Sequence, residues 1–211
     1  MVFKRLLLKS NLNFPLEEIN LKRQDQHNLI SDLSLMFRLL ARGFSYPDGE
    51  NASPVFLNSM EELARSCGLE TSGIACRPDE LREAYTRLFI NSPEGVPAPP
   101  YASFYVAGQG LLMQEGHDHA RDFYLRAGLE PVNDNEPADF LPVELFFVSV
   151  LLDKGDYSLL AEFAGRHLWA WFQLFEQRLH AAVPHPYYGL MAKLTLFYLR
   201  KLNEEVLNEA T

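Results

Sequence analysis

Residues 136–152 constrain the fold of this chain more than any other stretch. A polar entry, residues 136–140, leads into the apolar run 141–152, in which Glu144 is the one charged residue. As a helix, this run has no solvated face and must lie at the centre of the fold. The Asp139 carboxylate is well placed to cap such a helix, and Pro142 is tolerated in its first turn. The sequence therefore predicts a buried central helix.

Glu144 places a carboxylate on this otherwise apolar helix. An unpaired buried charge is costly, so the carboxylate needs a cation or several hydrogen-bond donors beside it. We expect it to pair with an arginine that helps to fix the packing. The alternative is that Glu144 takes a direct part in binding.

Composition and charge exclude several classes of protein. The chain has 211 residues, of which 47% are hydrophobic and 22% charged, as in an ordinary globular protein. This length allows one large domain or two small ones. The net charge of −9, without a cluster of lysine and arginine, argues against a nucleic-acid partner. An acidic surface suits a basic partner.

The cysteines and the apolar segments indicate the compartment. Cys67 and Cys76 have neither CxxC spacing nor a companion pair of histidines, so we interpret them as reduced residues of a cytosolic protein. The apolar run near the amino end is too short for a signal peptide, and Lys9 interrupts it. No later segment reaches the roughly 18 uncharged residues that a membrane span needs. We expect a soluble cytoplasmic protein without membrane insertion.

The spacing of apolar residues is helical along most of the chain, and no alternating strand pattern occurs. Ser53, followed by Pro54, and Asp156 are expected helix N-caps. Residues 1–24, which include Pro15, show no clear period and are expected to form an extended arm. A polar hinge is expected at residues 132–135. Besides the central helix, the predicted helices cover residues 25–43, 53–68, 78–89, 111–113, 117–127, 156–179 and 187–202. The predicted fold class is all-α.

The sequence carries no catalytic or metal-binding signature. His117 and His119 come nearest to a metal site, but such closely spaced side chains splay around a helix and no second cluster completes a tetrahedral set. His167 and Trp171 lie one helical turn apart and are assigned to the core. A nucleophile elbow, a phosphate-binding loop and a dinucleotide-binding glycine pattern are all missing. We predict that the chain is not an enzyme.

A proline-rich loop, residues 91–100, is the clearest feature that suits recognition. Its four prolines favour an extended backbone. Tyr101, Ser103 and Tyr105 follow directly and place aromatic surface beside this preset backbone, as in grooves that bind peptides. The alternative is that the two tyrosines pack on the helices behind them.

Four motifs follow one another along the chain. The first is Tyr-Thr-Arg-Leu-Phe at residues 85–89, and the second is Pro-Pro-Tyr-Ala-Ser-Phe-Tyr at residues 99–105. The third is Glu-Pro-Ala-Asp-Phe at residues 136–140, and the fourth is Phe-Ala-Gly-Arg-His-Leu at residues 163–168 with Trp171 and Phe175. In this order, the motifs resemble those of the TorD/DmsD/NarJ family of redox-enzyme maturation chaperones over nearly the whole chain.

The resemblance implies an all-helical chaperone without catalytic turnover. It implies an arm at residues 1–24, a helical portion at 25–132, and a hinge with a second helical portion at 133–211. Members of the family act in the cytoplasm, where they bind the twin-arginine leader or amino-terminal region of an apo-molybdoenzyme and hold it for molybdopterin cofactor insertion. The implied partner is such a client, bound through its leader peptide. Because a flexible hinge between two helical portions allows them to be exchanged, the chain is expected to be a monomer or a domain-swapped dimer.

Carried over residue by residue, the resemblance also implies a client-binding site. Its members are Pro100, Tyr101, Ser103 and Tyr105 on the loop, with Glu136, Pro137, Asp139 and Glu144 at the hinge and the central helix. The family has a histidine after the aspartate, where this chain has Phe140, so a titratable donor implicated in leader or guanine-nucleotide binding is lost. We expect no cofactor, and the departure disfavours GTP. The alternative functions are a NarJ-like nitrate reductase assembly factor, a chaperone for a metalloenzyme without a twin-arginine leader, and a GTP-binding or hydrolysing regulator.

Overall fold

The computed structural model describes residues 14–71, 73–74, 76–106, 115–129 and 136–207, with side chains described from residue 28 onward. Its helices are α1 (Phe14–Gly43), α2 (Pro54–Ser66), α3 (Pro78–Tyr85), α4 (Ala102–Val106), α5 (Glu115–Arg126), α6 (Leu141–Lys154), α7 (Tyr157–Glu162), α8 (Trp169–Ala181) and α9 (Pro186–Leu202). A short 3-10 turn covers Gly49–Ala52, and π-helical segments cover Thr86–Ile90, Phe163–Leu168 and Asn203–Leu207. Within the described ranges no strand occurs, apart from one bridge pair between Tyr101 and Phe140. The predicted all-α fold class is confirmed.

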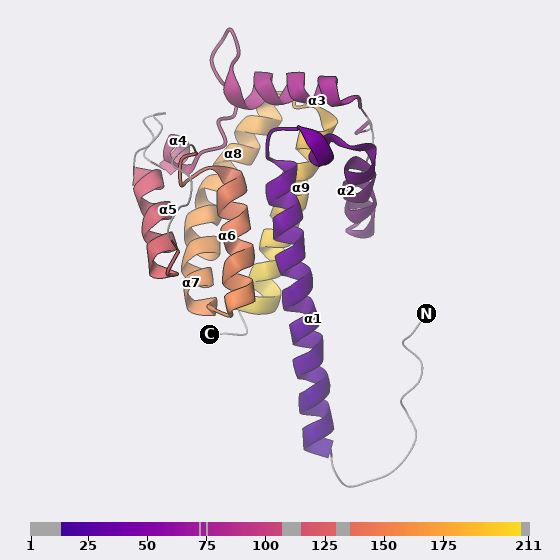
Figure 1. The fold of residues 1–211 in the computed structure, drawn as a ribbon, viewed down its shortest axis with the longest axis vertical. Coiled ribbons are helices and arrows are strands. Elements are labelled where there is room, and N and C mark those ends of the chain that lie inside the picture. The colour runs from indigo at the N-terminus through magenta and orange to yellow at the C-terminus, as the bar shows by residue number, and fades with distance from the viewer. Residues whose placement is uncertain (1–13, 72, 75, 107–114, 130–135, 208–211) are drawn as a thin grey trace.

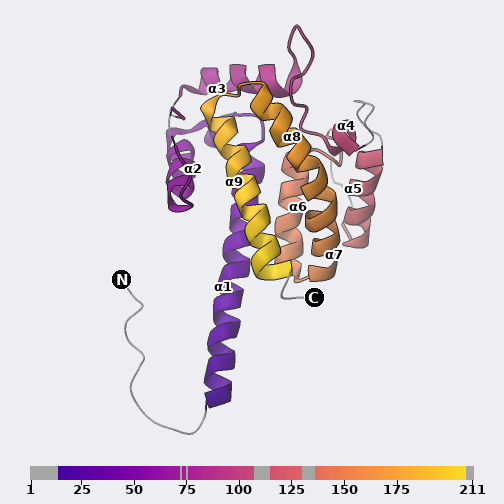
Figure 2. The same cartoon turned by 180° about the vertical axis from the view of Figure 1, so that it is seen from behind.

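The helices form a bundle around α6 and α1, which pack side by side (Figure 1). Helix α9 contacts both α1 and α8 on the opposite side of the bundle, as Figure 2 shows. Helix α3 crosses one end of the bundle, while α2 and α5 lie at opposite sides of the body. The core between these helices is rich in aromatic rings, among them Phe37 of α1, Phe147 of α6 and Phe175 of α8, all of which are buried.

Helix α1 begins earlier than the sequence analysis expected. Residues 14–24, expected to belong to an extended arm, are the first turns of α1, and residues 1–13 lie outside the described part of the chain. Pro15 stands in the first turn, where the missing backbone N–H has no intrahelical partner to lose, so it starts the helix and does not break it. In both views α1 projects well beyond the rest of the bundle.

Helix α6 occupies the central place that its composition predicts, with one difference. Leu145, Val148 and Leu151 are fully buried, and Pro142 lies in the first turn as expected. Phe146, however, is 50% exposed, and the guanidinium group of Arg38 lies 5.9 Å from the centre of its ring. One face of the helix therefore reaches the surface, where a cation covers part of its apolar area.

Two predicted helix caps are confirmed and a third is wrong. The Ser53 hydroxyl accepts a hydrogen bond from the Phe56 N–H at 3.2 Å, and the Asp156 carboxylate accepts one from the Leu159 N–H at 3.1 Å. Asp139 does not cap α6: the N-cap residue is Phe140, which makes no side-chain cap bond.

The remaining expectations concern the long helix after Asp156, a short helix, the hinge and membrane spans. The long helix expected after Asp156 is present as α7, a π-helical segment and α8 in succession. The helix expected at residues 111–113 and the hinge at 132–135 lie outside the described residues. In the ranges that the structure covers, no helix combines the length and apolar character needed to cross a membrane.

Candidate functional site

The second and third sequence motifs meet in space and form what we call the loop–hinge junction, residues 100–105 and 136–141. The Leu141 N–H donates to the Pro100 carbonyl at 2.9 Å, and the Ala102 N–H donates to the Asp139 carbonyl at 3.1 Å. The Ser103 N–H donates to Asp139 Oδ2 at 2.7 Å, across 36 residues of sequence. This explains why Asp139 does not cap α6: its carboxylate is engaged by the N-terminal turn of α4.

Two aromatic rings cover the junction. Tyr101 and Phe140 stack with ring centres 5.2 Å apart and an angle of 27° between their planes. Burial, followed by the negative charges of Glu136 and Asp139, raises the pKa of Tyr101 to about 12. The Tyr101 hydroxyl is therefore protonated at neutral pH and can donate a hydrogen bond. Phe140 contributes ring area here, where the family motif has a titratable donor.

The eight predicted binding residues differ in how far they reach the surface. Glu136 is exposed, and Tyr101, Pro137 and Tyr105 are half-buried. The others, Pro100, Ser103, Asp139 and Glu144, are buried. Four of the eight therefore present side-chain surface to solvent, and the buried four support them from within.

Three buried polar atoms of the junction make no hydrogen bond within the described part of the chain. They are Asp139 Oδ1, Ser103 Oγ and the Tyr105 hydroxyl. Buried polar groups are nearly always hydrogen-bonded in folded proteins, so three such atoms within two short segments are unusual. Within the described ranges, these three atoms can therefore take part in further hydrogen bonds.

Helix α5 holds the junction together from the outside. His117 Nδ1 accepts a hydrogen bond from the Ala138 N–H at 3.1 Å, and the Tyr124 hydroxyl donates to the Ala138 carbonyl at 2.6 Å. A side chain at Gly116 would not fit, because a Cβ there would lie 2.4 Å from the Ser103 nitrogen. Sequence reasoning missed these roles, since nothing local in the sequence connects α5 to residue 138.

The two histidines of this segment do not converge on a common point. His117 faces Ala138 and Asp139, whereas His119 lies 3.7 Å from Glu115 on the surface of α5. Among the residues that the structure covers, no group of three potential metal ligands comes together.

The buried carboxylate of Glu144 lies behind the junction. His167 Nε2 and Trp171 Nε1 are each 2.9 Å from one of its oxygens, so the expected arginine partner is wrong. The assignment of His167 and Trp171 to the core is confirmed by their burial. The indole of Trp171 stacks on the Tyr105 ring at 5.7 Å, which links this centre to the loop.

Glu144 and His167 perturb each other. Burial raises the pKa of the Glu144 carboxyl, although the charge of His167 and the hydrogen bonds from His167 and Trp171 oppose it. Burial alone lowers the pKa of His167, but the charge and hydrogen bond of Glu144 outweigh this effect, so the pKa lies above its ordinary value. The pair therefore holds protons more readily than the same groups do in the unfolded chain.

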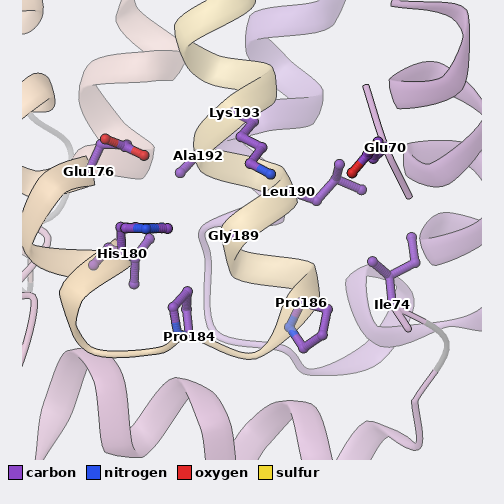
Figure 3. Close-up of a pocket in the computed structure, with 11 residues that line it drawn as sticks. Glu70, Ile74, Glu176, His180, Pro184, Pro186, Gly189, Leu190, Ala192 and Lys193 are labelled. Carbon is purple, nitrogen blue, oxygen red and sulfur yellow. The ribbon is translucent and has the colours of Figure 1, made fainter. Parts of the chain in front are cut away.

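A separate cavity of about 230 Å³ opens near the start of α9, and none of the eight predicted residues lines it. In Figure 3, Lys193 lies between Glu176 and His180 on one side and Glu70 on the other. Ile74 and Leu190 contribute buried apolar surface. Because acidic and basic side chains both line this cavity, its charge favours neither an anion nor a cation as a ligand.

Comparison with known proteins agrees with the motif pattern. Residues 56–177 match the family model described as nitrate reductase delta subunit. The crystal structure of a proposed redox enzyme maturation protein from Archaeoglobus fulgidus is similar, with a TM-score of 0.56 and 29% sequence identity. That similarity covers 76% of this chain and 90% of the other. The family match spans more than half of the chain and contains the whole loop–hinge junction. The chain thus belongs to the nitrate reductase delta subunit family of redox-enzyme maturation chaperones, which are assembly factors and not catalysts.

Proposed function

We propose that this protein is a cytoplasmic, client-specific chaperone that binds the twin-arginine leader or amino-terminal region of a molybdoenzyme apoprotein at the loop–hinge junction. It holds the apoprotein until the molybdopterin cofactor is inserted, before export or assembly. The observation that supports this most strongly is the bond between the Ser103 N–H and Asp139 Oδ2, because it unites two motifs of the family in one place.

The surface of the junction suits a basic peptide. Glu136 is exposed beside the stacked rings of Tyr101 and Phe140, so a cationic side chain can pair with the carboxylate while its stem lies on the rings. Complementary charge guides such encounters and favours the right partner. The net charge of −9 adds a long-range attraction for a basic leader.

The buried members of the predicted site support its surface. Asp139 fixes the loop through the Ser103 N–H, and its second oxygen can accept a further hydrogen bond. Glu144 does not reach the surface and acts through Trp171, whose indole stacks on Tyr105. We assign these residues the role of holding Tyr101 and Tyr105 in position.

The alternative functions differ in the client. The description of the matching family favours assembly of a nitrate reductase. A client without a twin-arginine leader would fit the replacement of the family histidine by Phe140. A GTP-dependent regulator has less support, because Phe140 offers no polar group for a base and is stacked on Tyr101.

Calorimetric titration with a panel of twin-arginine leader peptides and nitrate reductase amino-terminal peptides tests the proposal. We expect micromolar binding of one peptide, weakened about tenfold in Tyr101→Ala and Asp139→Ala, which corresponds to about 1.4 kcal/mol. Tyr46→Ala is the matched control, because this tyrosine is also accessible but lies outside the junction. Binding that neither junction substitution weakens would contradict the site, and measurable GTP turnover would favour the regulator.

A further inference from the structure

Two side chains of helix α5 bind the backbone of a single hinge residue, Ala138, through its N–H and its carbonyl. His117 and Tyr124 are seven residues apart, which is two helical turns, so they lie on one face of α5. The Ala138 N–H donates to His117 Nδ1, and the Ala138 carbonyl accepts from the Tyr124 hydroxyl. The backbone that carries Asp139 is therefore positioned by two side chains of a helix that the family motifs do not include.

The bond to His117 requires a particular protonation state. A ring nitrogen accepts a hydrogen bond only when it carries no proton, so neutral His117 must hold its proton on Nε2. In the protonated ring both nitrogens are donors. The same Nδ1 lies 3.7 Å from Asp139 Oδ1, which is buried and has no hydrogen-bond partner in the described ranges. His117 Nδ1 thus faces a donor, the Ala138 N–H, and an acceptor, Asp139 Oδ1.

We propose that His117 is a proton-controlled positioning residue of the loop–hinge junction. Neutral His117 accepts from the Ala138 N–H and holds the hinge in the geometry described above. Protonated His117 donates to Asp139 Oδ1 and releases the Ala138 amide. Histidine is the side chain that ordinarily changes charge between pH 5 and 8, which sets the pH range of the test below.

The consequence for client binding rests on the proposed function. A charged His117 neutralises Asp139 and draws its carboxylate away from the Ser103 N–H, which loosens the loop that carries Tyr101. A basic peptide then meets less negative charge and a less ordered surface. The protein is therefore expected to hold a basic client more tightly at neutral than at acidic pH.

Other charged groups surround His117 and must be separated from it. The His119 side chain is 52% exposed and lies beside Glu115, so a change of its charge acts at the surface of α5 and not at the junction. His167 titrates as well, but its hydrogen-bond partner is Glu144 and its influence on Asp139 is purely electrostatic. The charged or titratable groups of the junction and behind it are Glu136 and Asp139 of the hinge, Tyr101 of the loop, and the Glu144–His167 pair. The other charged or titratable groups on the turns of α5 next to His117 are Glu115, Asp118, His119 and Arg121, all exposed.

The test compares three variants of the full chain. His117→Asn keeps an acceptor close to the place of Nδ1 but cannot titrate, His117→Leu removes the acceptor, and His119→Asn is the matched control on the same helix. The readout is the NMR signal of the Ala138 amide between about pH 5.5 and pH 8. We expect this signal to titrate in the wild type and in His119→Asn. In His117→Asn it should stay near its high-pH position, and in His117→Leu it should be displaced throughout.

Leader affinity provides a second, separable readout. We expect the wild type to bind a basic leader about fivefold more weakly at pH 5.5 than at pH 7.5, and His117→Asn to change less than about twofold. A wild-type Ala138 amide that does not respond to pH would overturn the inference, whether or not a leader binds. A titrating amide in a protein that binds no leader would uphold the inference and overturn the proposed function.

Discussion

Among the side chains that the structure describes, two carboxylates are completely buried, Asp139 at the loop–hinge junction and Glu144 in α6, and their hydrogen bonding differs. Both oxygens of Glu144 are engaged, one near His167 and one by the Trp171 indole. Asp139 has one oxygen engaged by the Ser103 N–H, while the other has no hydrogen-bond partner within the described residues.

We propose that this difference separates a structural role, at Glu144, from a role in client binding, at Asp139. A buried charge whose hydrogen bonds are complete fixes the packing around it and costs much to disturb. A buried carboxylate with one oxygen that has no hydrogen-bond partner in the described ranges can accept a bond from a group that binds and leaves, such as a client or protonated His117. The expected effects of substitution therefore differ in kind at the two carboxylates: stability depends on Glu144, and affinity depends on Asp139.

The largest expected effect is on stability at Glu144. Replacement by alanine leaves the donors of His167 and Trp171 buried without a partner, so Glu144→Ala should lower the free energy of unfolding by about 3–5 kcal/mol. Denaturation in urea measures this change, and the exposed Glu83→Ala is the control, with an expected change below about 0.5 kcal/mol. A loss below about 1 kcal/mol in Glu144→Ala would show that the centre is not structural.

The next effect concerns the close contact between α5 and the junction. The new methyl group of Gly116→Ala would meet the backbone of Ser103 at 2.4 Å, so we expect a loss of about 1–3 kcal/mol and weaker client binding. At the cavity of Figure 3, a Cβ at Gly189 would make an ordinary 3.6 Å contact with Pro184. Gly189→Ala in α9 should therefore be neutral or stabilise by up to about 1 kcal/mol. Similar thermal shifts in the two variants would contradict the packing described for α5.

A smaller effect is expected in the pH dependence of stability. The pKa values of Glu144 and His167 are raised in the folded protein, above 4.5 and 6.5 respectively, so the folded state binds protons more readily than the unfolded chain. Their contribution is present below those values and is lost as the pH rises through the raised ones. The melting temperature should therefore fall between pH 6 and pH 8 because of His167, by an amount on the order of 2–4 °C.

Glu144→Gln tests the origin of this slope. The glutamine oxygen still accepts from Trp171, but the charge that raises the pKa of His167 is gone, so the fall of the melting temperature should flatten or reverse. Circular dichroism of both proteins at the two pH values measures it. An unchanged slope in Glu144→Gln would assign the pH dependence to other groups.

The smallest expected effect on stability is that of Asp139→Asn. The asparagine oxygen can still accept from the Ser103 N–H, so the free energy of unfolding should change by less than about 1 kcal/mol. Denaturation in urea compares it directly with Glu144→Ala. A loss as large as that of Glu144→Ala would remove the distinction between the two carboxylates.

Much of the fold was predictable because its signals are local. Ser53 and Asp156 mark helix starts through bonds that span three residues, and the apolar run of α6 predicts its central place. The cap assigned to Asp139 failed because a distant donor, the Ser103 N–H, engages its carboxylate. The partners of Glu144 were missed for the same reason: His167 and Trp171 lie more than twenty residues away, on a face that only the packed bundle defines.

The candidate site was predictable only as two separate segments. The loop and hinge motifs contain the candidate residues, but only the structure shows that the two motifs contact each other. The sequence singled out His117 only as part of the nearest approach to a metal site, because its contact with Ala138 depends on how α5 lies against the junction. Pairs of motifs can therefore be found in a sequence, whereas the side chains that hold them together come from the fold.

The most direct test of the account is one calorimetric titration of the leader that binds, carried out on the wild type, Asp139→Asn and Glu144→Gln. The account predicts about tenfold weaker binding in Asp139→Asn, where one of the two negative charges of the junction is lost. It predicts a change below about twofold in Glu144→Gln, where the Trp171 bond and the Tyr105 stack are kept. Equal weakening in both variants, or weakening in Glu144→Gln alone, would contradict the placement of the client at the loop–hinge junction.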